Sequence, residues 1–367
     1  MRRFRRLLIA AALPLICLSC SQRDGNTWDP TVYKALKAVL KDSRGRYAVF
    51  DFDKTSIVHD ISQALWVYQI EHLEFAKAPE HLFMDGIPDS GREIYPGLTL
   101  AAFGSGLKAE YDSLRTMLDA GASLGDIHST PTYLDFRAKM HCLLCRMDGI
   151  FERNISYLWM PGLLAGYTEE QARSLVKDAI REHLGKDRIA VEDWKSPDGL
   201  WEGRVERGIF FSPEMKKLYR EMKRSGIDAY VCSASLELIV EELACDPVLG
   251  PGLPPERVFG LRFVPSDTLR VSFDPDYPQP MGSGKVECIK ECIAPEYGGR
   301  GPVLVAGDSN GDVPMLSSFS DMAKGLIIDV GRNPDSPIGR LAARARTEGA
   351  AGTYLLQTSF VPSEGSI

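Results

Sequence analysis

Four apolar residues, Tyr47 to Phe50, stop abruptly at Asp51, where the acidic and hydroxyl-rich sequence DFDKTS begins. A short, wholly apolar run that ends in polar residues is typical of a buried parallel strand. In doubly wound α/β folds, the loops at the carboxyl ends of such strands carry the chemistry. This feature therefore predicts that the strand lies inside a sheet and presents Asp51 at one edge of it.

The second half of the chain alternates helical and strand patterns. Residues 213–225 place apolar side chains on one helical face and end at Gly226, and residues 227–232 follow as a strand. This alternation predicts an α/β fold with a doubly wound, mostly parallel, Rossmann-like sheet. The other expected elements are helices over 31–40 and 236–244, a hairpin of 258–263 with 269–273, and strands over 303–306 and 326–330.

A long segment of different character separates the first strand from this half. Residues 61–75 and 169–183 are amphipathic at helical spacing, and strand patterns are rare from Ser56 to about Glu206. We expect a helical domain over residues 57–206, inserted into a core domain formed by residues 21–56 and 207–360.

The N-terminal sequence MRRFRRLLIAAALPLICLSC combines basic residues, a short apolar run and small residues before a cysteine. These are the parts of an export signal, which we place at residues 1–20. The apolar run is shorter than the ~20 residues that a membrane-spanning helix needs. CLSC resembles a bacterial lipoprotein signal whose cleavage would leave Cys20 lipidated. We therefore expect a lipoprotein on the periplasmic face of a bacterial membrane, with plain secretion as the alternative.

Charge and cysteine content add two constraints. The formal charge of -7 and the pI near 5.5 provide no positive field for nucleic acid. An exported chain can form disulfides, but spacing does not reveal their pairing. The HCLLC sequence at residues 141–145 favours helix packing or one disulfide over half a zinc site, because no second ligand pair follows. The cysteines beyond the signal are Cys142, Cys145, Cys232, Cys245, Cys288 and Cys292.

Asp51 and Asp53 form a carboxylate pair that can divide two chemical roles. An ionised Asp51 can attack phosphorus in line, whereas Asp53 keeps a proton more easily because a neighbouring negative charge raises its pKa. Attack by a carboxylate on a phosphate dianion needs a divalent cation to screen the repulsion. The sequence GDSNGD adds Asp308 and Asp312, whose hard oxygen donors suit Mg²⁺ better than zinc.

The phosphoryl oxygens also need donors. Ser233, in the sequence CSAS after an apolar strand, offers a hydroxyl, and Lys285, in GSGK, offers an ammonium. GSGK does not complete a nucleotide-binding P-loop, because Gln279 stands where the first glycine should be and Val286 where Ser or Thr should be.

Together, DFDKTS, CSAS, GSGK and GDSNGD, in this order, resemble the haloacid dehalogenase superfamily of aspartate-nucleophile phosphatases. The resemblance covers residues 46–330 and implies a helical cap inserted after the first motif. Gly311 departs from the phosphoserine phosphatase-like branch, which commonly has Asn there. The roles implied are nucleophile and metal ligand for Asp51, general acid and base with a metal-binding carbonyl for Asp53, phosphate binding for Thr55, Ser233 and Lys285, and metal binding for Asp308 and Asp312.

HDISQALWVYQIEHLEF, SPEM and VCSAS further resemble exported bacterial phosphatases of the phosphorylcholine phosphatase type. A choline headgroup binds to aromatic faces and carboxylates. His59, just past the first motif, could touch substrate or cap a helix. The aromatic candidates are Trp66, Tyr68, Trp159, Trp194 and Trp201, although most of them are expected to fill the core of the inserted domain.

The predicted function is hydrolysis of small phosphate monoesters, such as phosphorylcholine or phosphoserine-like compounds, by a Mg²⁺-dependent phosphatase. One alternative is a phosphotransferase that passes the phosphoryl group from Asp51 to an alcohol. The other is a non-catalytic lipoprotein that binds phosphorylated ligands. Against the latter stands the repulsion that Asp51 and Asp53 would exert on a bound anion.

Overall fold

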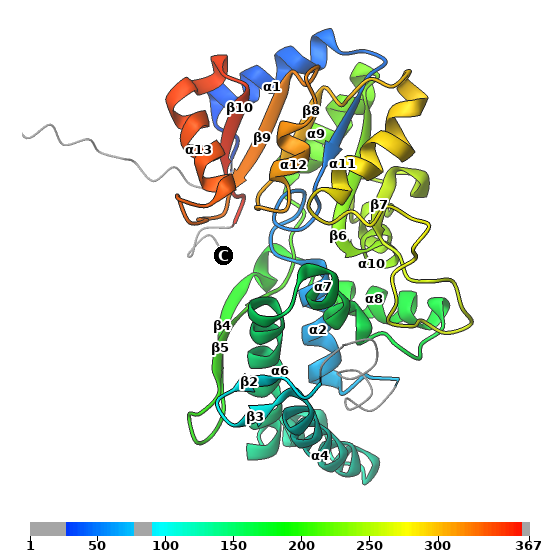
Figure 1. Ribbon diagram of the computed structural model, residues 1–367, viewed down its shortest axis with the longest axis vertical. Coiled ribbons are helices and arrows are strands. Elements are labelled where there is room, and N and C mark those ends of the chain that lie inside the picture. Colours follow the sequence, from blue (N-terminus) through cyan, green and yellow to red (C-terminus); the bar gives the residue numbers. More distant parts are fainter. Residues whose placement is uncertain (1–26, 77–89, 362–367) are drawn as a thin grey trace, which may run out of the picture.

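The computed structural model describes residues 27–76 and 90–361. The expected signal peptide, with Cys20, lies outside the described residues. Figure 1 shows a part built on a parallel sheet at the top and a mainly helical part below it. No helix among the described residues is both long and apolar enough to cross a membrane.

A six-stranded sheet in the order β10-β9-β8-β1-β6-β7 forms the upper part. Every neighbouring pair of strands in it is parallel. The first strand, β1, lies in the interior of the sheet and all its residues are buried. The predicted α/β fold with a mostly parallel, Rossmann-like sheet is thus confirmed. The strands are β1 (Tyr47–Phe50), β6 (Asp228–Leu236), β7 (Val258–Leu261), β8 (Leu304–Gly307), β9 (Lys324–Asp329) and β10 (Tyr354–Thr358).

Helices cover both faces of this sheet, and β1 shows why its sequence is wholly apolar. Ala48 and Phe50 join one hydrophobic cluster, whereas Tyr47 and Val49 join another on the opposite face. The flanking helices are α1 (Pro30–Asp42), α9 (Pro213–Ser225), α10 (Glu237–Ala244), α11 (Gly284–Cys288), α12 (Val313–Ser317) and α13 (Pro337–Glu348). Short helical turns occupy Lys186–Arg188, Pro255–Arg257, Ile289–Ile293, Ala294–Tyr297 and Gly349–Ala351.

The lower part, which we call the helical lobe (residues 61–207), has its own hydrophobic core. Trp66, Trp159 and Trp194 are buried in this core. Its helices are α2 (Ile61–His72), α4 (Leu100–Asp119), α5 (Leu124–His128), α6 (Pro131–Ile150), α7 (Arg153–Gly162) and α8 (Glu169–His183). Its hairpins are β2 (Glu93–Tyr95) with β3 (Leu98–Thr99) and β4 (Ala190–Lys195) with β5 (Glu202–Arg207).

The chain enters and leaves the helical lobe at adjacent points. Val58 on the way in and Phe210 on the way out form an isolated antiparallel bridge. Ile209 donates its backbone N–H to the carbonyl of His183 over 2.9 Å, so the end of α8 is tied to the returning chain. The base of the lobe is therefore a narrow, hydrogen-bonded connection.

Local structure agrees with the sequence only in part. The helix over 213–225 has the expected bounds, with Ser212 as N-cap and Gly226 at φ 70° as C-cap. The hairpin expected from 258–263 and 269–273 is confirmed only at its end, where Phe263 forms an antiparallel bridge to Phe273 flanked by backbone hydrogen bonds. The preceding residues form β7, which pairs in parallel with β6. The six cysteines beyond the signal are unpaired.

Candidate active site

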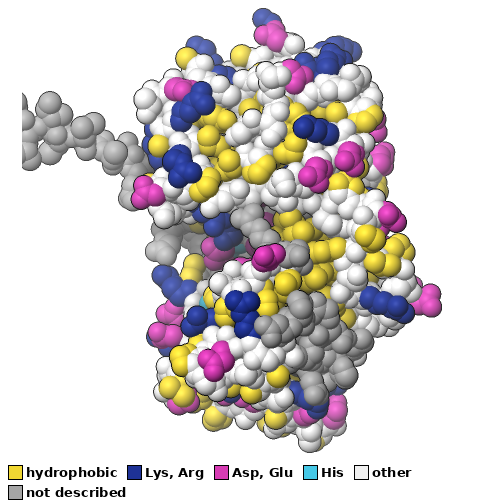
Figure 2. All heavy atoms as spheres, in the orientation of Figure 1, with side chains coloured by type: hydrophobic (Ala, Val, Ile, Leu, Met, Phe, Trp, Pro, Cys, Tyr) yellow, Lys and Arg dark blue, Asp and Glu magenta, His cyan; other side chains and the backbone are white. Residues whose placement is uncertain are grey.

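A cavity of about 290 Å³ lies at the carboxyl edge of the sheet, where the sheet faces the helical lobe. Figure 2 shows a recess between the upper and lower parts with basic and acidic side chains in it. Five of the predicted site residues line the cavity, namely Asp51, Asp53, Ser233, Lys285 and Asp308. The other two, Thr55 and Asp312, are buried beside it.

The Lys285 ammonium, on the first turn of α11, lies between two carboxylates. Its Nζ donates to Oδ1 of Asp51 over 2.6 Å and to Oδ1 of Asp312 over 2.6 Å. Only 2% of Lys285 is exposed to solvent. The two acids raise its pKa against the opposing effect of burial, so this ammonium remains charged.

Asp312 holds the loop that follows β8 in place through hydrogen bonds. Its Oδ2 accepts hydrogen bonds from the N–H groups of Asp308 and Ser309 and from the Ser309 hydroxyl. A Cβ on Gly307 would lie 2.4 Å from Cβ of Asp312, so only glycine permits this approach. With Oδ1 bound to Lys285, both oxygens of Asp312 are engaged.

Asp53 lines the same cavity but is held by other donors. The Ile61 N–H, at the start of α2, donates to Oδ1 over 2.7 Å, and the Ser235 hydroxyl donates to Oδ2 over 2.7 Å. Ser62 in turn donates to Ser235 over 2.8 Å. Burial raises the pKa of Asp53, and the charges of Asp60 and Asp51 add to the rise. Burial thus favours the protonated form of Asp53, whereas the hydrogen bonds from Ile61 and Ser235 favour its carboxylate.

Hydroxyl groups complete the loop after β1. The Thr55 hydroxyl lies 3.4 Å from Oδ2 of Asp51 and 3.4 Å from Oδ1 of Asp308. The Ser56 hydroxyl donates to the Asp51 carbonyl over 2.7 Å and lies 2.8 Å from the Tyr219 hydroxyl. The loop therefore holds Asp51 from both its backbone and its side chain.

Three buried carboxylates form a group that fits a divalent cation. Asp51, Asp308 and Asp312 each offer an oxygen within 4.8 Å of the others. Burial, followed by the charge of Asp312, raises the pKa of Asp51 to about 8 and that of Asp308 to about 6. Burial also opposes ionisation of Asp312, but Lys285 and Ser309 hold its pKa below the usual value. Such crowding of negative charge, with oxygen donors alone, suits a hard cation.

Several lining residues carry no motif that sequence analysis could have found. Arg332 donates to Oδ2 of Asp308 over 2.5 Å, and Ser235 holds Asp53. Asp148 on α6 and Tyr157 on α7 reach the cavity from the helical lobe. For Ser235, the only available signal was its place in CSAS, two residues after Ser233.

None of the aromatic candidates for a choline site lines this cavity. Trp66, Trp159 and Trp194 fill the core of the helical lobe, and Trp201 packs against it. Tyr68 stacks on His72 instead. His59 is buried, and its Nδ1 lies 3.1 Å from the Arg207 carbonyl, at the connection between the two parts. These residues serve packing, and Tyr157 is the aromatic side chain beside the acidic group.

Comparisons with known proteins bear on the family and the fold of this chain. Residues 144–317 match the haloacid dehalogenase-like hydrolase family. Phosphorylcholine phosphatase from Pseudomonas aeruginosa is 26% identical over 257 residues, which cover 70% of this chain and 60% of that protein. The match therefore spans less than two thirds of that relative's length.

One solved structure shares the fold. A protein of unknown function from Anaerococcus prevotii superposes with a TM-score of 0.77 at 26% identity, covering 93% of this chain and 98% of that one. A phosphoserine phosphohydrolase-like protein from Francisella tularensis gives a TM-score of 0.40 at 13% identity, covering 81% and 92%. The family match over residues 144–317 confirms the resemblance inferred from the motifs, and it covers a little less than half of the chain.

Proposed function

We propose that this chain is a Mg²⁺-dependent phosphatase that hydrolyses small phosphate monoesters through an aspartyl-phosphate on Asp51. The observation that carries the proposal is the 2.6 Å contact between Lys285 and Asp51 in a cavity shared with Ser233 and Asp308. An ammonium, a hydroxyl and buried carboxylates are the groups that phosphoryl transfer to a carboxylate requires.

In the proposed reaction, a carboxylate oxygen of Asp51 forms a bond to phosphorus while the bond to the leaving alcohol oxygen breaks. A Mg²⁺ ion held by Asp51 and Asp308 would screen the repulsion between carboxylate and phosphate. Lys285 and Ser233 bind phosphoryl oxygens, and Asp312 holds Lys285 in place by accepting a hydrogen bond from its ammonium. Each residue therefore acts on charge that develops at phosphorus.

Asp53 supplies and removes the protons. It protonates the leaving alcohol and then accepts a proton from the water that hydrolyses the acyl phosphate. Its raised pKa supports this role, because the group must carry a proton at the start of the reaction. The bonds from Ser235 and from the Ile61 N–H support a fixed orientation of the carboxyl group.

We infer that the helical lobe acts as a cap that selects the leaving group. Asp60, Asp148 and Tyr157 line the cavity with two carboxylates and an aromatic ring. These are the groups that bind a quaternary ammonium, which cannot donate hydrogen bonds. The name of the Pseudomonas relative supports a quaternary ammonium as the leaving group. The proposed substrate class is therefore a phosphate monoester of a cationic alcohol, of which phosphorylcholine is an example.

A neutral isostere tests this inference. We expect kcat/KM for phosphorylcholine to exceed that for 3,3-dimethylbutyl phosphate, which replaces the nitrogen by carbon, by roughly tenfold or more. Asp148→Asn should lower kcat/KM for phosphorylcholine and leave the neutral ester unaffected. Asp119→Asn, an exposed change on the same lobe, is the control.

Equal kcat/KM for the two esters would refute the choice of substrate but not the phosphatase activity. Product analysis in the presence of a high concentration of an added alcohol distinguishes a phosphatase from the phosphotransferase alternative. Transfer of phosphate to that alcohol in place of water would assign a phosphotransferase.

A further inference from the structure

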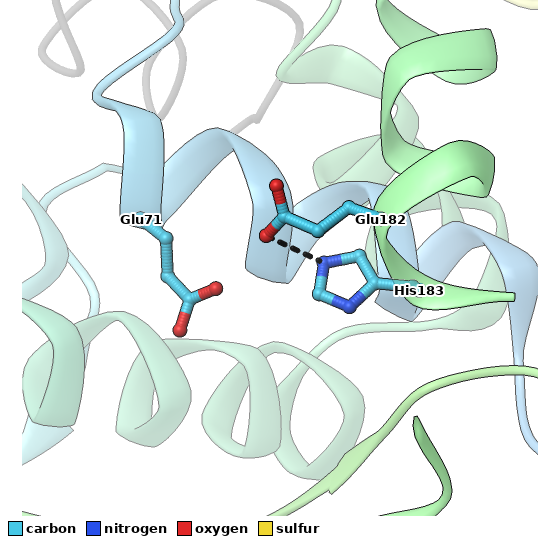
Figure 3. Close-up of side chains that lie close together, drawn as sticks. All are labelled: Glu71, Glu182 and His183. Atoms are coloured by element: carbon cyan, nitrogen blue, oxygen red, sulfur yellow. Dashed lines mark ion pairs between the residues drawn. The ribbon is translucent and has the colours of Figure 1, made fainter. Parts of the chain in front are cut away.

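A second group of candidate metal ligands lies in the helical lobe, away from the cavity. Glu71 comes from the end of α2, and Glu182 and His183 come from the end of α8 (Figure 3). Each offers one ligand atom within 4.8 Å of the others. None of the three lines the cavity that contains Asp51.

His183 distinguishes this group from an ordinary cluster of acids. Only 3% of the residue is exposed, and its Nε2 has no hydrogen-bond partner among the described residues. That atom points to Glu182, with 3.9 Å between Nε2 and Oε1. Burial lowers the pKa of His183 to about 4, so the imidazole is neutral at pH 7 and its nitrogen is free to coordinate. A buried nitrogen without a partner is costly unless something binds it.

In the surrounding contacts, Glu71 and Glu182 each use one of their two carboxylate oxygens. Arg207 donates to Oε2 of Glu71 over 2.7 Å and also binds Glu192. His72 Nε2 lies 3.0 Å from Oε2 of Glu182. Burial raises the pKa of Glu71 even though Arg207 opposes the rise. Glu71 and Glu182 therefore each keep one carboxylate oxygen outside these two contacts.

We propose that Glu71, Glu182 and His183 bind a divalent transition-metal ion of the zinc type. One imidazole and two carboxylates are donors that zinc accepts, and two ligands at ~2.1 Å from the same ion are at most ~4.2 Å apart. The 3.9 Å between His183 and Glu182 satisfies this limit, and a small rotation of the Glu71 side chain completes the set. His72 contacts Glu182 from outside this set of three.

The location gives the ion a structural role. It joins the ends of α2 and α8 at the point where the His183 carbonyl accepts the Ile209 N–H of the returning chain. Zinc at this place ties two helices to the base of the lobe, so we expect it to raise the melting temperature without taking part in the phosphoryl transfer.

The test is Zn²⁺ and Co²⁺ binding to the full chain in saturating Mg²⁺, which occupies the acidic site of the sheet. We expect one Zn²⁺ per chain, a visible Co²⁺ absorption typical of four or five ligands, and a higher melting temperature. Glu182→Gln should abolish all three; its side chain is 40% exposed, so the variant can fold. Glu170→Gln, an exposed change on the same helix, should behave as wild type.

Two results would overturn the proposal. One is equal Zn²⁺ binding by wild type and Glu182→Gln. The other is a thiolate-to-cobalt absorption band that Cys145→Ser removes, which would place the ion at the His141 and Cys145 pair instead. Hydrolysis of phosphate esters by Glu182→Gln in Mg²⁺ alone should equal that of wild type, so the outcome is independent of the proposed phosphatase function.

Discussion

Nζ of Lys285 lies 2.6 Å from Oδ1 of Asp51, although 234 positions separate the two residues in the chain. The contact arises because α11 and the end of β1 meet at the carboxyl edge of the sheet. It leaves the carboxylate beside a permanent positive charge and beside Asp308, which contacts the same Thr55 hydroxyl.

Replacing the proposed nucleophile should stop turnover while the fold persists. In Asp51→Asn the amide keeps the shape of the carboxylate but cannot form the covalent intermediate, so kcat should fall by at least ~10³. The measurement is release of inorganic phosphate from an aryl phosphate, with circular dichroism to verify folding. Asp193→Asn, on the exposed hairpin of the lobe, is the matched control. Retention of even a tenth of the activity would contradict the assigned role.

Removing divalent metal should have two effects. Chelator-treated protein should lose activity, because Asp51 and Asp308 would no longer share a cation, and Mg²⁺ should restore it. Its melting temperature should also rise on addition of Mg²⁺, since binding relieves the repulsion among three buried acids. Asp308→Asn should show neither the activity nor the Mg²⁺-dependent rise. Full activity after chelation would refute the metal-dependent mechanism.

Loss of the buried ammonium should destabilise the protein. Lys285→Met leaves Asp51 and Asp312 without their shared cation, and breaking a buried ion pair costs about 3–5 kcal/mol of unfolding free energy. Urea denaturation measures this change. Lys290→Met, an exposed lysine on the next turn, should cost almost nothing. A loss below about 1 kcal/mol would show that Asp51 takes up a proton and absorbs the effect.

The buried imidazole predicts how stability depends on pH in metal-free protein. The folded pKa of His183 is about 4, below the ~6.5 of an unfolded histidine, so the unfolded chain takes up a proton first as pH falls. Neutral His183 contributes up to about 3 kcal/mol to the unfolding free energy. This contribution is complete above about pH 6.5 and is lost as pH falls toward 4. His183→Phe should flatten the dependence of unfolding free energy on pH across this window. Parallel curves for both proteins would contradict the assignment.

The sheet and the position of its motifs were predictable because both depend on simple rules. Buried parallel strands are apolar on both faces, and their carboxyl ends share one edge. The loops after β1 and β8, which hold Asp51 and Asp308, therefore had to meet. The same rule did not reveal Arg332, Asp148 or Tyr157, because single residues from distant loops and helices carry no spacing pattern.

Two errors have physical causes. The expected pairing of 258–263 with 269–273 followed from a local turn, but β6 offered a free edge along which β7 could pair in parallel. The residues of the β4–β5 hairpin are mostly polar or exposed. Its two inward side chains, Trp194 and Val205, gave too weak an alternation of apolar and polar residues to predict the strands. In both cases tertiary packing outweighed local preference.

The bridge between Val58 and Phe210 has an evolutionary consequence. An insertion whose two ends emerge side by side can be lengthened, shortened or exchanged without rethreading the sheet that hosts it. Selection for a new alcohol could therefore rebuild the lobe, with its own separate core, while Asp51 and its neighbours stay untouched. Under the proposed function, the groups that hydrolyse the ester and the groups that select its alcohol would then change independently.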